Sequence, residues 1–169
     1  GVSGASVAAV TPVSGTVYTV SVNTGTGNGT IRLDVTDDDS IADSAGNALG
    51  GTGAGNGNFT TGQFYTVDIS PPFVVSIVRN GASPTNATSV SYTVTFNENV
   101  TGVNNGDFAL NTSGVTGTSI TSTTQVTPST YTVTVNTGSG SGTLRLDLSD
   151  NDSIQDSLGT PLGGAGNGN

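Results

Sequence analysis

The stretch of sequence that decides the fold occurs twice. Residues 18–51 read YTVSVNTGTGNGTIRLDVTDDDSIADSAGNALGG, and residues 131–164 read YTVTVNTGSGSGTLRLDLSDNDSIQDSLGTPLGG. The match covers all of residues 1–51 against 114–164 at a constant offset of 113, with about half of the positions identical, and AGNGN recurs at 54–58 and 165–169. A period of roughly 110 residues is the size of one domain. We therefore expect residues 1–69 to be the C-terminal part of one repeat and residues 70–169 to be most of the next, without its last strand.

Alternating apolar and polar residues mark the strands within this repeat. Tyr131, Val133 and Val135 fall on one face of a strand, and polar residues fall on the other. The same pattern predicts strands at Phe64–Ile69, Val74–Val78, Val90–Phe96, Phe108–Leu110, Thr118–Ser122, Tyr131–Asn136 and Thr143–Leu148. Glycine-rich segments at 23–29 and 136–142 are typical of hairpin loops. About seven short strands per unit predict an all-β protein of tandem immunoglobulin-like Greek-key β-sandwich repeats, with a unit boundary at Pro71-Pro72.

The composition argues against several classes of function. Lys and Arg total 3 against 12 Asp and Glu, which gives a net charge of -9, and the chain has no His and no Cys. Such a chain repels a phosphate backbone, so we expect no nucleic-acid partner, and no apolar run is long enough for a membrane span. The usual nucleophiles and proton shuttles are missing, and no clear cleft is expected for a pair of catalytic carboxylates. We therefore expect no enzymatic activity.

The quoted segments resemble a known family. Residues 91–110, SYTVTFNENVTGVNNGDFAL, followed by residues 131–164, are similar to the bacterial immunoglobulin-like (cadherin-like) repeats of very large surface proteins. Asp43-Ser-Ala-Gly-Asn47 matches the family's D-x-x-G-N element, whereas the second copy, Asp156-Ser-Leu-Gly-Thr160, has Thr in place of the Asn. The resemblance implies repeats that form the stalks of adhesins and filaments, often stiffened by calcium.

Acidic residues gather after the Leu-rich strand in both copies. Four or more carboxylates within ten residues repel one another unless a cation or hydrogen-bond donors offset them. One interpretation is a calcium site, because calcium takes six to eight oxygen ligands; the other is a solvated loop whose Asp side chains cap turns. A boundary site that joins Asp68 to Glu98 or Asp107 is a further expectation. The candidate ligands are Asp34, Asp37, Asp38, Asp39, Asp43, Asp68, Glu98, Asp107, Asp150, Asp152 and Asp156.

The sequence leaves two functions in competition. The first is a structural repeat of a secreted or cell-surface bacterial filament, stalk or adhesin that serves cell adhesion or biofilm formation. Its partners would be neighbouring copies of the repeat, in the same chain or by strand donation in a fibre. The alternative is an immunoglobulin-like module whose end loops bind a glycan or a protein. Exposed aromatic residues in the loops would favour the second function.

Overall fold

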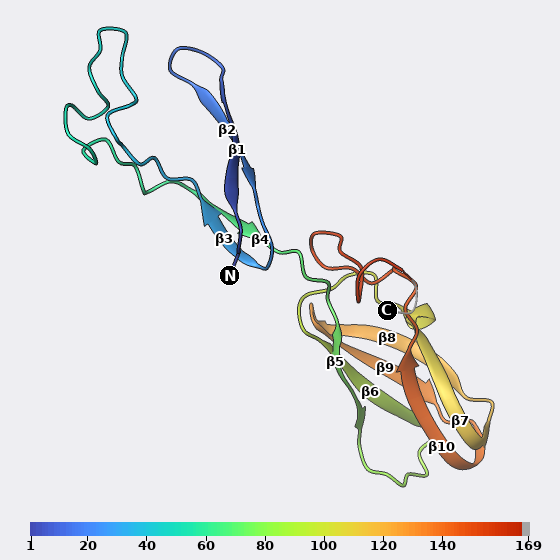
Figure 1. Cartoon of the computed structure of the whole chain (residues 1–169). Helices are drawn as coiled ribbons and strands as arrows, with labels where there is room; N and C mark the ends of the chain where they lie inside the picture. The colour runs from blue at the N-terminus through green and yellow to red at the C-terminus, as the bar shows by residue number, and fades with distance from the viewer. Residues whose placement is uncertain (167–169) are drawn as a thin grey trace. The chain divides into compact units, whose positions relative to one another are not determined.

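The computed structural model describes residues 1–166, and its chain divides into two units, Gly1–Ile69 and Ser70–Asn169. The described residues form ten strands and one three-residue 3-10 helix, η1 (Asn105–Asp107), and they contain no α-helix. The prediction of an all-β protein is therefore confirmed. The end of the repeated AGNGN segment, residues 167–169, lies outside the described residues. Figure 1 shows the strands of each unit.

The second unit contains a four-stranded and a two-stranded antiparallel sheet. The larger sheet has the order β5 (Val74–Asn80), β6 (Ser89–Phe96), β9 (Thr130–Asn136), β8 (Ser119–Thr127). The smaller sheet pairs β7 (Phe108–Thr116) with β10 (Ser139–Leu148). Both sheets join strands that are distant in sequence, since β6 pairs with β9 and β7 pairs with β10.

One hydrophobic core lies between these two sheets. The larger sheet contributes Val94, Phe96, Tyr131, Val133 and Val135, and the smaller sheet contributes Phe108 and Leu146, while Val100, Ile154 and Leu162 come from loops. The alternation in the sequence explains this core, because every second side chain of β9 points to the same face of its sheet. The Tyr131 hydroxyl donates to the Val100 carbonyl at 2.9 Å, and its ring meets Phe96 edge to face, with ring centroids 5.9 Å apart.

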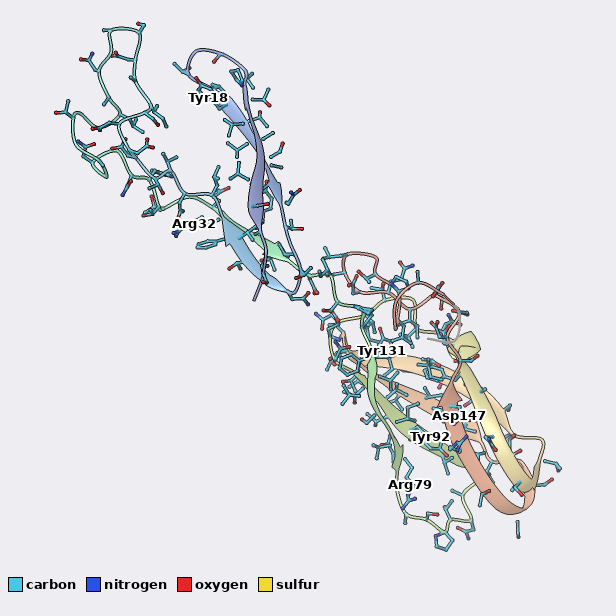
Figure 2. The ribbon with its side chains drawn as sticks, viewed as in Figure 1. Tyr18, Arg32, Arg79, Tyr92, Tyr131 and Asp147 are labelled. Atoms are coloured by element: carbon cyan, nitrogen blue, oxygen red, sulfur yellow. The ribbon has the colours of Figure 1, made fainter. Side chains whose placement is uncertain are left out.

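The first unit consists of two separate strand pairs. Strand β1 (Ser6–Pro12) pairs with β2 (Tyr18–Asn23), and β3 (Gly29–Arg32) pairs with β4 (Phe64–Val67), as Figure 1 shows. At the repeat offset, β1, β2 and β3 correspond to β8, β9 and β10. Little of this unit is buried: Tyr18 is 58% exposed, whereas its counterpart Tyr131 is 5% exposed (both are labelled in Figure 2).

Most expected strands form where the alternation placed them, but several bounds differ. Strand β10 begins at Ser139 rather than Thr143, so the hairpin loop expected at 136–142 is shorter, and β4 ends at Val67 rather than Ile69. Two further strands are longer than expected. Strand β7 continues to Thr116 rather than ending at Leu110, and β8 continues to Thr127 rather than ending at Ser122. These extensions consist mainly of Ser, Thr and Gly, which carry no apolar alternation. They are strands because β10 and β9 pair with them, with register shifts along both pairs.

Candidate metal centre

In the first acidic loop, carboxylates accept hydrogen bonds from the loop backbone. Asp37 is buried, and its two carboxylate oxygens accept from the Asp39 amide at 3.2 Å and the Gly57 amide at 3.1 Å. Asp39 has a positive φ of 66° and accepts from the Gly53 amide at 2.9 Å. Asp38 accepts from the Ser40 amide at 3.1 Å. These side chains therefore cap turns, as the solvated-loop interpretation predicts.

The second acidic loop repeats the same contacts. Asp150, the counterpart of Asp37, accepts from the Asp152 amide at 3.1 Å. Asp152 has a φ of 62° and accepts from the Gly166 amide at 3.1 Å, as Asp39 does from Gly53. The two copies therefore share local structure as well as sequence.

Each acidic loop is preceded by an Arg–Asp ion pair. Arg32 binds Asp34 through two nitrogens, at 2.6 and 2.9 Å, and Arg145 binds Asp147 in the same way, at 2.7 and 2.9 Å. The hydrogen bonds from Arg32 and Arg145 lower the pKa of the Asp34 and Asp147 carboxyls below the ordinary value. These two arginines are therefore engaged by one carboxylate each.

The two copies differ at the D-x-x-G-N element. The Asp43 Oδ1 atom accepts from the Ala45 and Asn47 amides at 2.9 Å each, and its Oδ2 atom accepts from the Asn47 side-chain Nδ2 at 2.9 Å. These bonds, chiefly those from Asn47, lower the pKa of Asp43. Every carboxylate oxygen of Asp43 thus has a donor from the loop itself.

Asp156 keeps only half of this arrangement. Its Oδ1 atom accepts from the Leu158 and Thr160 amides at 2.8 Å each, but its Oδ2 atom is buried and has no hydrogen-bond partner. Thr160 stands where the first copy has Asn47, so the side-chain N–H donor is lost. Burial raises the pKa of Asp156, but hydrogen bonds from the Thr160 and Leu158 amides, the Thr160 side chain and the Gly159 amide outweigh burial and leave the pKa below its ordinary value. A buried carboxylate oxygen without a donor is costly.

A second carboxylate lies close to Asp156. Glu98 is half-buried, and carboxylate oxygens of Glu98 and Asp156 lie within 4.8 Å of each other. Glu98 Oε1 accepts from Asn97 Nδ2 at 3.0 Å. A pair of this kind offers hard oxygen ligands, one of them an unpaired buried atom, which is the donor chemistry that calcium prefers.

Asp107 and Asp68 have other surroundings. Asp107 is fully buried, with its two carboxylate oxygens accepting from Ser153 Oγ and from the Asn104 amide, both at 2.7 Å. It closes a capping box around η1, so both of its carboxylate oxygens already have hydrogen-bond donors within the second unit. Asp68 belongs to the first unit, where Asn28 Nδ2 donates to it. The expectation that Asp68 joins a boundary site stays a prediction.

The carboxylates of the Asp34–Asp43 loop lie apart from one another in the described residues. Among residues 1–166, no three carboxylates of this loop bring one oxygen each within 4.8 Å of one another. Asp37, Asp38 and Asp39 turn toward the amides that they cap, and Asp34 turns toward Arg32. The calcium interpretation of this loop stays a prediction. The better candidate pair, Glu98 and Asp156, is separated by more than 50 residues in the chain. The sequence names both residues as candidate ligands, but it does not pair them.

Comparison with family models, with curated proteins and with solved structures finds no match for this chain. No helix in the described part of the chain is long and apolar enough to cross a membrane.

Proposed function

We propose that this chain is a section of a tandem array of immunoglobulin-like Greek-key β-sandwich repeats in a secreted or cell-surface bacterial filament, stalk or adhesin. The observation that carries the proposal is the internal repeat, whose copies share an ion pair and an acidic turn. Arg32–Asp34 and Asp39–Gly53 recur at the same offset of 113 residues as Arg145–Asp147 and Asp152–Gly166. Repeats that preserve such contacts form arrays in which each unit is a similar structural module.

The strand order of the second unit supports the sandwich part of the proposal. Two antiparallel sheets enclose one core, and the chain crosses between the sheets after β6, before β8 and after β9. Crossings of this kind are typical of Greek-key sandwiches. The strongly acidic composition, with no lysine, suits a solvated extracellular surface and gives no support to a nucleic-acid role.

We also propose that the second unit binds calcium through Glu98 and Asp156. The unpaired Asp156 Oδ2 atom supports this part, because a bound cation would satisfy an oxygen that has no donor. The ion would supply a positive charge that holds the Glu98 segment, which follows β6, against the Asp156 loop, which follows β10. Calcium would in this way stiffen the end of the second unit.

Thermal melting of the whole chain tests the calcium proposal. Calcium at ten times its Kd stabilises a folded protein by about 1.4 kcal/mol, which raises Tm by roughly 6–11 °C in a domain of this size. We expect this rise when millimolar calcium replaces excess chelator. Asp156→Asn and Glu98→Gln should remove the rise. Identical melting temperatures of the unsubstituted chain in calcium and in chelator would contradict the calcium proposal. They would favour the solvated-loop interpretation for Glu98 and Asp156.

A gain-of-donor substitution gives a sharper test. Thr160→Asn restores the side-chain N–H that Asn47 donates to Asp43 in the first copy. We expect this variant to melt higher than the unsubstituted chain in chelator and to respond less to calcium. Asp43→Asn is the matched control, because it changes the corresponding carboxylate in a loop that already has its donors, and it should keep the calcium response.

The array and surface parts of the proposal need their own experiment. Antibodies raised against residues 70–166 should label intact cells of the source organism, and external protease should remove that label. The gene on either side of this segment should encode further copies at a spacing of roughly 110 residues. Labelling only after permeabilisation, together with flanking sequence that lacks the repeat, would contradict the proposal.

A further inference from the structure

The second unit contains a cavity of about 790 Å³ between its two sheets. One wall comes from β5, β6 and the loop that joins them, with residues 79–88, Val90 and Tyr92, and the opposite wall comes from the start of β10 and the turn before it, with residues 137–144. Arg79 and Tyr92 are register partners on neighbouring strands, and both are labelled in Figure 2. The Tyr92 hydroxyl donates to the Leu144 carbonyl at 2.9 Å, so it bridges the two walls. The cavity therefore separates the sheets where β10 runs past β5 and β6.

The first unit shows a partner for the strand that forms one wall of this cavity. At the repeat offset, β3 corresponds to part of β10, and β3 pairs with β4 in the register Gly29↔Val67, Ile31↔Tyr65 and Arg32↔Phe64. The counterparts of Gly29 and Ile31 are Gly142 and Leu144, which both line the cavity. Within the described residues, β10 pairs with β7 and with no second strand.

We propose that this cavity is the slot for the last strand of the repeat, a segment with the sequence of β4 that the same chain delivers directly after residue 169. The proposal rests on the repeat organisation proposed above and names the partner of one of its surfaces. In the slot, the counterparts of Val67, Tyr65 and Phe64 pair with Gly142, Leu144 and Arg145. The slot, once filled, removes a free sheet edge, which is otherwise an open site for pairing with other chains.

Side-chain chemistry fits this register. Successive side chains of a strand alternate between faces, so Tyr65 and Val67 share the face that β3 gives to Ile31. In the slot that face turns toward Val90, Tyr92 and Leu144, which are half-buried and packed against the core cluster. Phe64 lies on the opposite face, where the Arg32 guanidinium sits 5.1 Å from its ring centroid. Arg145 stands at the same position in the second copy and offers the same cation–π partner.

The lining of the cavity favours a strand over a small ligand. Glycine, serine and threonine supply much of it, and Arg79 is the one charged residue among the lining residues. A ligand pocket normally places a few convergent polar groups on a largely apolar wall. A strand instead needs a backbone edge and an apolar patch, which β10 and the Val90–Tyr92 pair provide.

A fusion protein tests the proposal. Residue 169 matches residue 58 in the repeat, so a copy of residues 59–69 is appended after residue 169 of the full chain. Within Gly142–Arg145, we expect exchange to slow by at least ~10-fold at those of the four amides that point away from β7, in proportion to the local opening equilibrium. We also expect Tm of the second unit to rise by more than about 4 °C. Unchanged exchange at these amides would overturn the proposal, whatever the calcium and surface-labelling experiments show.

Variants within the appended segment separate slot binding from a general effect of the added residues. Val67→Asp in that segment places a charge on the inward face and should abolish both changes. Thr66→Asp places the same charge on the outward face and should leave both changes intact. Equal effects of the two substitutions would contradict the proposed register.

The source of the strand is tested separately. A free peptide of residues 59–69, added to the unfused chain, should slow exchange at the same amides, and this readout holds even where the fusion fails to fold. The fused chain should remain monomeric in light scattering at all concentrations. A fused chain that dimerises through these amides would show that a second copy occupies the slot and would overturn delivery by the same chain.

Discussion

The matched tyrosines Tyr131 and Tyr18 allow a direct test of how differently the two units are packed. They occupy the same position of the repeat, but Tyr131 is 5% exposed and Tyr18 is 58% exposed. Replacing Tyr131 with Phe keeps the ring that meets Phe96 edge to face and removes only the hydroxyl. The Val100 carbonyl, which accepts from that hydroxyl at 2.9 Å in a buried contact, then loses this donor.

The size of the effect follows from this geometry. A buried acceptor that loses its donor costs about 1–3 kcal/mol. With a urea m value of about 1–3 kcal/mol/M, a cost of ~2 kcal/mol lowers the urea midpoint by roughly 1 M. Tyr18 has no hydrogen bond that ties its hydroxyl to a buried group of the described first unit, so Tyr18→Phe should change the free energy of unfolding by less than about 0.5 kcal/mol.

Circular dichroism and amide hydrogen exchange suit this measurement, because the chain has no Trp. Exchange also assigns the effect to β9 and to the segment around Val100. A Tyr131→Phe variant whose urea midpoint matches that of the unsubstituted chain would refute the reasoning, since the buried hydroxyl would then contribute nothing. A large loss in Tyr18→Phe would refute it in the other direction.

Two further predictions concern pH and glycine. Hydrogen bonds from Arg32 and Asn47 lower the pKa of Asp34 and Asp43 below 3.8. The stabilising contribution of these bonds is therefore complete above that value and is lost as the pH falls toward the folded-state pKa. Melting at stepped pH should show a loss of stability below about pH 4, and stability that rises down to pH 3 would contradict this prediction. Gly102 and Gly159 both have a φ of 86°, but a Cβ at Gly102 would overlap the Ser153 carbonyl oxygen, whereas a Cβ at Gly159 meets nothing within 4 Å. Gly159→Ala should therefore lower the free energy of unfolding by roughly 1–2 kcal/mol, for the left-handed backbone alone. Gly102→Ala should lower it clearly more, as measured by urea unfolding. Equal losses would show that the loop after Asp152 moves freely away from the new Cβ.

Local apolar alternation made most strands predictable. The extensions of β7 and β8 lack this alternation, so the sequence did not predict them. Val133 and Val135 alternate with Thr, so period-two reasoning places β9 correctly. The polar residues of β8 after Ser122 have no such alternation, and only pairing with β9 makes them a strand. Pairing of this kind depends on residues distant in sequence, which a local pattern does not contain.

The candidate site was predictable in its residue types and much less so in its geometry. The sequence places Asp156 in an acidic loop, but it does not show that one carboxylate oxygen is buried without a donor. It also does not show that Glu98 comes within 4.8 Å of Asp156, because their proximity depends on how the loops after β6 and β10 meet. The cavity beside Tyr92 was not foreseen for the same reason, since its walls belong to different sheets.

The contrast between the units shows what a repeat sequence needs in order to fold. The segments of β2 and β9 are nearly identical, yet Val133 and Val135 are fully buried, whereas Val22 is exposed and Val20 is only half-buried. In the second unit β6 pairs with β9, and β7 pairs with β10. The described first unit has no counterpart of β5, β6 or β7. Apolar alternation thus specifies which face of a strand is to be buried, but the burial itself comes from the opposing strands.

This dependence predicts what the first unit needs in order to bury its apolar faces. Val7, Val10, Tyr18, Val22 and Leu33 are all exposed in the first unit, and soluble proteins rarely leave such apolar surface uncovered. A segment similar to residues 71–113, fused before Gly1, restores the missing strands at the repeat offset. It should slow amide exchange across β2 to the rate measured across β9. Exchange across β2 that stays fast after this addition would show that the first copy has lost the ability to form the sandwich, despite keeping its sequence.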